Sequence, residues 1–144
     1  MMLAFFLISC QENIQETDSK GVSQNTQNNY TINQKEMAKI MNKGKIIYEQ
    51  CVACHQKNGE GIIGAFPPLA KSDYLSQDLN TIVKRIINGS SEPIIVNEIE
   101  YPGNMMPNFR YLSDEELAFV ATYVLNSWGN RRGLITEKTI NLNR

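Results

Sequence analysis

The segment Cys51-Val52-Ala53-Cys54-His55 holds the residues best placed to do chemistry. Two thiols separated by two residues and followed by an imidazole form the C-x-x-C-H pattern that attaches a c-type haem. The two sulfurs can add to the two vinyl groups on one edge of a porphyrin, and a helical turn between them gives about the required separation. The adjacent histidine then lies under the ring, where its Nε2 can bind iron. The segment therefore predicts one covalently bound haem c.

Three other uses of this segment are weaker. A structural zinc site needs four ligands, but the only other cysteine is Cys10, and the chain has no second histidine. A thioredoxin-like redox pair needs a βαβ context, whereas the sequence around the segment has helical periodicity. A plain disulfide between Cys51 and Cys54 leaves His55 without a role.

His55 fills one axial position of the iron, so the second axial ligand decides what the haem can do. Without another histidine, the candidates are Met105 and Met106, which lie in the loop 103–107 shortly before a predicted helix. A loop methionine can reach an iron from such a place, although methionine also often fills gaps in cores. The residues alone do not choose between the two.

Three amphipathic stretches are predicted to position these groups. Apolar residues recur at helical spacing over 37–51 and over 79–87, where Asn88-Gly89 ends the second stretch. Ser113 begins the third helix, which runs through Trp128.

The ends of the third helix and the loops complete the predicted fold. Ser113 and Glu116 fit a capping box, and Gly129 stands where a C-cap glycine would. The loops 58–68 and 92–108 are long for so small a domain, which indicates that they wrap a large apolar group; within the second, 94–96 is a possible short strand. We expect an all-α fold of three to four helices, with long loops wrapped around one haem.

The two ends of the chain define the predicted domain limits. Residues 1–10 are predicted to be the end of an export signal, and their ending Leu7-Ile8-Ser9-Cys10 resembles the lipobox of bacterial lipoproteins, in which the cysteine thiol is lipidated. A plain cleaved signal is the alternative. Residues 11–34 are rich in Asn and Gln and are predicted to be a disordered tether. The folded domain is predicted at 35–130, followed by a polar C-terminal tail at 131–144.

Composition and charge argue against two classes of protein. The 144 residues carry 14 Lys+Arg against 15 Asp+Glu, a net charge of -1, whereas nucleic-acid binders normally have a basic excess. The longest apolar run, at 1–8, is far shorter than the ~20 residues of a membrane-spanning helix. We therefore expect no nucleic-acid partner and no spanning helix, and any membrane attachment would use the lipid on Cys10.

The chain resembles the class I, mitochondrial-type cytochrome c domains of bacterial envelopes over about residues 35–130. The segments that carry the resemblance are Cys51–His55, Asn58–Gly61, Phe66–Leu69, Met106-Pro107, Leu112–Leu117 and Tyr123-Val124. The resemblance implies that Met106 is the sixth ligand, that the Pro67 carbonyl accepts a hydrogen bond from Nδ1–H of the ligating histidine, and that Leu69 packs on the haem.

The same resemblance implies that the first and last helices cross through a glycine and an aromatic residue. Tyr123 matches the aromatic of the last helix. The family usually has glycine and an aromatic eight and four residues before the first motif cysteine, where this chain has Lys43 and Ile47. Gly44 and Tyr48 lie one position closer, so either the helix is one residue shorter or the crossing uses Gly44 in a shifted register.

The predicted function is that of a one-electron carrier rather than an enzyme. It would cycle haem c iron between Fe(III) and Fe(II), lipid-anchored at the periplasmic side of a bacterial cell envelope, with transient redox protein partners. A haem enzyme or gas sensor is the alternative if the methionine is not bound to iron. A third interpretation, compatible with the first, is an electron-transfer subunit of a larger oxidoreductase.

Overall fold

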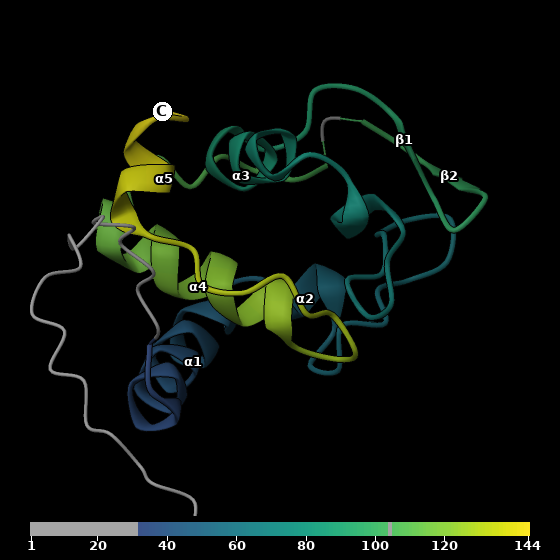
Figure 1. Ribbon diagram of the computed structural model, residues 1–144. Coiled ribbons are helices and arrows are strands. Elements are labelled where there is room, and N and C mark those ends of the chain that lie inside the picture. Colours follow the sequence, from purple (N-terminus) through teal and green to yellow (C-terminus); the bar gives the residue numbers. More distant parts are fainter. Residues whose placement is uncertain (1–31, 104) are drawn as a thin grey trace, which may run out of the picture. The chain divides into compact units, whose positions relative to one another are not determined.

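Two helices, α1 (Gln34–Tyr48) and α4 (Asp114–Asn126), pack across each other (Figure 1), and α4 contributes a large share of the buried core. The computed structural model describes residues 32–103 and 105–144. The predicted lipidation site at Cys10 and all but the last three residues of the tether predicted at 11–34 lie outside these residues. Asn33 caps α1 by accepting the N–H of Glu36 at 2.9 Å.

The crossing of α1 and α4 depends on Gly44. A Cβ at this position would collide with the carbonyl oxygen of Phe119 and the Cβ of Tyr123. One turn later the rings of Tyr48 and Tyr123 lie 5.4 Å apart between centroids. The crossing therefore uses Gly44 and Tyr48, one residue nearer the cysteine pair than the family pattern.

Between the two long helices the chain forms short elements and a hairpin. They are α2 (Val52–His55), the 3₁₀ turn η1 (Tyr74–Ser76), α3 (Leu79–Asn88), β1 (Ile94–Val96) and β2 (Ile99–Tyr101). The side chain of Asp78 caps α3 by accepting two backbone N–H groups. The strands pair antiparallel, with Ile94 opposite Tyr101 and Val96 opposite Ile99.

α4 begins as predicted but ends earlier. Ser113 and Glu116 make both hydrogen bonds of a capping box. The helix ends at Asn126, two residues before the predicted end at Trp128, and Gly129 is not its C-cap. The amide of Asn126 donates to the carbonyls of Thr122 and Gly133, both at 2.7 Å, so side-chain donors replace the expected glycine cap.

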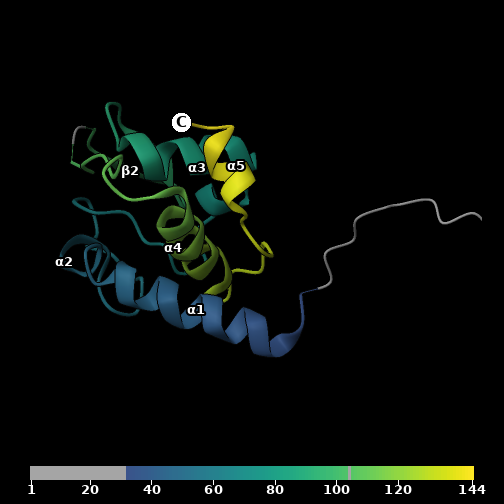
Figure 2. The same ribbon diagram turned by 90° about the vertical axis from the view of Figure 1, so that its left-hand side faces the viewer.

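The sequence predicts residues 131–144 to lie outside the folded domain, as a polar tail. In the structure this segment packs on α4 and belongs to the same unit as the rest of the described chain. Ile135 and Ile140 are buried, and Thr122 of α4 exchanges two hydrogen bonds with the backbone of Ile135. The segment ends with a short helix, α5 (Glu137–Asn141). In both views α4 lies between α1 on one side and α3 and α5 on the other (Figure 2).

The described residues therefore form a small helical fold with one two-stranded hairpin, in agreement with the predicted all-α class. None of their helices combines the length and the apolar character needed to cross a bilayer.

Candidate functional site

A single helical turn carries the two thiols and the imidazole. The backbone N–H of Cys51 donates to Tyr48 at the end of α1, and that of His55 donates back to Cys51 at 2.9 Å. Cys51 and Cys54 are half-buried and form no disulfide. Burial, and secondarily the neighbouring Cys54, raises the pKa of the Cys51 thiol to about 11.

His55 is held in one orientation. Its Nδ1 lies 2.9 Å from the carbonyl oxygen of Pro67, the contact expected of that proline. With Nδ1–H donating to this carbonyl, the lone pair is on Nε2 at the other side of the ring. His55 is 8% exposed, and burial lowers its pKa while the hydrogen bond to Pro67 acts in the opposite direction. The imidazole is thus kept neutral, as a metal ligand must be.

Two hollows beside His55 together make one apolar crevice, with empty volumes of about 800 and 680 Å³. Eight residues line both: Gln50, Cys51, His55, Pro67, Arg85, Ile94, Met106 and Phe109. Leu69 lines the larger hollow and Cys54 the smaller one. A crevice with two thiols and an imidazole along its wall fits a large flat apolar group attached through sulfur, and so fits haem c.

The two candidate methionines differ in their relation to this crevice. Met106 is half-buried and lines both hollows, whereas Met105 lines only the smaller one and is 48% exposed. The carbonyl of Met106 accepts the N–H of Ser90 at 3.0 Å. A Cβ on Gly89, the residue that follows α3, would collide with the carbonyl oxygen of Met106. The end of α3 therefore lies directly against the loop that carries Met105 and Met106, called the methionine loop below.

Sequence reasoning missed Arg85, a half-buried cation on the wall of the crevice. Its Nη1 donates to the Ser90 hydroxyl at 2.9 Å and its Nε to the Tyr74 hydroxyl at 3.3 Å. A positive charge in such apolar surroundings needs an anionic partner, and haem carries two propionate carboxylates. The available signal was an arginine within the apolar stretch of 79–87.

A second missed feature supports the loop after His55. The Tyr48 hydroxyl donates to the carbonyl of Gln56 at 2.8 Å. The indole of Trp128 packs against both Tyr48 and Gly59. The Gly59 carbonyl in turn accepts the N–H of Leu69 at 2.7 Å, which joins this loop to the residue expected against the haem.

Comparison with protein families agrees with this geometry. A family model described as Cytochrome c matches residues 41–128, which include the cysteine pair, His55 and Met106. The chain belongs to the cytochrome c family. Its cofactor is haem c, attached covalently through Cys51 and Cys54, and the zinc, thioredoxin-like and plain disulfide alternatives no longer apply.

Curated cytochromes show the same relationship. The chain is 38% identical over 93 residues to cytochrome c-552 of Thermus thermophilus, covering 62% of this chain and 70% of that protein. It is 32% identical over 100 residues to the cytochrome c subunit of a quinone alcohol dehydrogenase of Gluconobacter oxydans, and 29% over 106 residues to the fructose dehydrogenase cytochrome subunit of Gluconobacter japonicus. These matches cover 63% and 67% of this chain, but only 20% and 21% of the two subunits. A domain of this family transfers electrons.

Proposed function

We propose that this cytochrome c domain is a one-electron carrier of a bacterial cell envelope, with His55 and Met106 as the two axial ligands. The observation that carries the proposal is that His55 and Met106 line the same two hollows as Cys51. When bound, the haem supplies a reversible change between Fe(III) and Fe(II). With His55 and Met106 both holding the iron, no coordination site would remain for a substrate, so the domain would act as a carrier rather than an enzyme.

The protein's own residues orient, bind and exclude water. The Pro67 carbonyl fixes the ring of His55 through Nδ1 and leaves Nε2 as the atom that would bind the haem iron. The thioether of Met106 would be a soft, weakly donating ligand that favours the reduced state and raises the reduction potential. The apolar wall keeps water away, so little rearrangement accompanies a change of charge. Arg85 would compensate the negative charge of the haem propionates.

The proposal for the cell envelope depends on the N-terminal sequence. Cys10 ends a stretch that resembles a lipobox, and lipidation there would anchor the protein at the periplasmic side of a membrane. Residues 11–34 would then act as a tether that lets the domain reach more than one partner. Haem c is attached outside the cytoplasm in bacteria, which supports an exported protein.

The partners we propose are other redox proteins, met transiently. A carrier of this kind uses a small contact area that forms and separates quickly. The similarity to cytochrome subunits of alcohol and fructose dehydrogenases favours a second candidate, an electron-transfer subunit held by a larger oxidoreductase. Isolation of the protein from its membrane under mild conditions separates the two: a carrier elutes alone, and a subunit elutes with its enzyme.

The experiment that tests the carrier function is spectroscopic. The purified holoprotein should show the reduced-minus-oxidised spectrum of haem c and a single one-electron wave in a redox titration. The weak near-infrared absorption of methionine-ligated ferric haem should disappear in Met106→Ala and remain in Met105→Ala. Loss of the band in Met105→Ala alone would show that Met105, not Met106, binds the iron. A wild-type protein that lacks the band and binds carbon monoxide readily would favour a sensor or an enzyme.

A further inference from the structure

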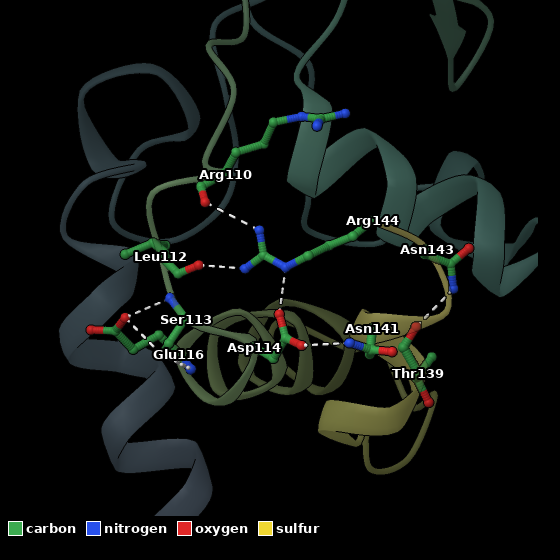
Figure 3. Close-up of polar contacts among 9 residues, drawn as sticks. All are labelled: Arg110, Leu112, Ser113, Asp114, Glu116, Thr139, Asn141, Asn143 and Arg144. Carbon is green, nitrogen blue, oxygen red and sulfur yellow. Dashed lines mark hydrogen bonds and ion pairs between the residues drawn. The ribbon is translucent and has the colours of Figure 1, made fainter.

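Arg144 joins the C-terminal segment to the chain between the methionine loop and α4. Its Nη1 donates to the carbonyl of Arg110 at 3.1 Å, its Nη2 to the carbonyl of Leu112 at 2.6 Å, and its Nε to the carboxylate of Asp114 (Figure 3). The planar guanidinium can make these three contacts together because its donors have a fixed fork geometry. No other hydrogen bond to either carbonyl oxygen is present in the described part of the chain.

The turn that Arg144 holds forms part of the crevice wall. Phe109 lines both hollows and Leu112 lines the larger one, and each is 8% exposed. The N–H of Leu112 donates to the carbonyl of Phe109 at 3.0 Å, which closes the turn. Phe109 follows Met106 by only three residues. Any movement of this turn therefore acts directly on the methionine loop.

Two elements hold the turn from different sides. On the α3 side, the N–H of Phe109 donates to the carbonyl of Ile87 at 2.9 Å, and Nε of Arg110 donates to the Asn88 side chain at 2.9 Å. On the other side are the contacts of Arg144. The start of α4 also has a cap of its own, made by Ser113 and Glu116 without Arg144.

We propose that Arg144 is a positioning residue for the sixth ligand: by clamping the turn 109–112 it keeps Met106 against the iron. The inference rests on the proposed ligation by Met106. Methionine ligation is an equilibrium between a bound and a released sulfur, and an added ligand binds only to the released form. Its apparent affinity is therefore proportional to the released population. Without the clamp, that population rises.

The test is an imidazole titration of the ferric holoprotein. Arg144→Ala should lower the apparent dissociation constant for imidazole about tenfold, the change expected from loss of a charge-assisted hydrogen bond, and should weaken the near-infrared methionine band. Arg144→Lys retains the charge but lacks the planar fork that meets two carbonyls and the Asp114 carboxylate together, so its affinity should lie between those of the wild type and the alanine variant. The matched control is Arg131→Ala, which removes an equal charge from the same segment at an exposed side chain.

A second control separates positioning from general loss of stability. Ile140→Val removes one buried methyl group from α5 without touching the clamp, and should lower Tm by a few degrees while imidazole affinity stays unchanged. An unchanged imidazole affinity in Arg144→Ala, or equal gains in imidazole affinity in Arg144→Ala and Ile140→Val, would overturn this inference but leave the Met106 assignment in place. Persistence of the near-infrared methionine band in Met106→Ala would instead overturn the ligand assignment, and with it the inference.

Discussion

The indole of Trp128 packs against Gly59, four residues after His55. A Cβ built on Gly59 would lie 2.7 Å from Cε3 of the indole, and the glycine has a φ of +73°. Trp128 itself has a φ of +52°, outside any helix, and its ring also contacts Tyr48 and Tyr123. The loop after the haem-binding histidine is therefore held by an aromatic residue that follows α4.

This contact makes Gly59 and Gly64 a matched pair for mutation. Gly59→Ala meets both the left-handed backbone and the indole, and should lower the free energy of unfolding by about 2–4 kcal/mol. Gly64 has the same φ of +73° but nothing within 4 Å of the added Cβ, so Gly64→Ala should cost only about 1 kcal/mol. Denaturant unfolding of both variants measures the difference. Equal losses would show that the indole contributes nothing to the cost.

The predicted membrane anchor is tested by Cys10→Ser. A lipid on the Cys10 thiol is the proposed attachment, and each buried CH₂ of an acyl chain contributes about 0.8 kcal/mol. The variant should therefore move from the membrane fraction to the soluble fraction and retain its haem spectrum. Cys54→Ser is the contrasting variant: it should leave the fractionation unchanged and make haem attachment incomplete, seen as haem extracted by acidified acetone. Retention of Cys10→Ser in the membrane would contradict the lipoprotein proposal.

The parts of the fold set by local sequence were predictable. The cysteine pair and His55 lie within one helical turn, so their spacing alone identifies the haem site. The capping box at Ser113 and Glu116 is equally local, because both partners lie within three residues. The pattern over 79–87 placed α3 correctly because its apolar residues face one side and Gly89 ends it.

The parts that depend on distant partners were not predictable. The hairpin turn puts Asn97 and Glu98 at positive φ, and it is held by Asp73, whose carboxylate accepts the Asn97 N–H at 2.8 Å across 24 residues. The segment 131–144 has a polar composition, yet two isoleucines and Arg144 attach it to α4. In each case a few long-range contacts override the local pattern, and a single sequence does not show them.

Arg85 should influence the reduction potential. Its charge lies on the crevice wall, where a cation favours the reduced iron because that state carries one positive charge less. Arg85→Gln should lower the potential, on the order of tens of millivolts. Lys84→Gln, which removes an equal charge at the adjacent exposed position, should change it much less because solvent screens that charge. Protein-film voltammetry measures both, and equal shifts would mean that Arg85 acts only through net charge.

Two carboxylates at the start of α4, those of Asp114 and Glu116, should make the free energy of unfolding fall at acid pH. Hydrogen bonds from Arg144 lower the pKa of Asp114 below 3.8, and hydrogen bonds from Ser113 lower the pKa of Glu116 below 4.5. Both folded pKa values lie below the unfolded ones, so this stability is present above about pH 4.5 and is lost as the pH falls through the folded values. The free energy of unfolding should therefore fall more steeply below pH 4.5 in the wild type than in the double variant Asp114→Asn, Glu116→Gln.

Comparison of the two proteins removes the shared effect of acid on the haem ligands, since both retain His55 and Met106. The difference in their free energies of unfolding should be constant from pH 5 to pH 7, where both carboxylates are ionised in the folded and unfolded chains. It should shrink below pH 4, as protonation removes from the wild type the charges that the amides lack. A difference that stays constant down to pH 3 would contradict a role for these carboxylates, and would show that the acid sensitivity of the domain arises elsewhere.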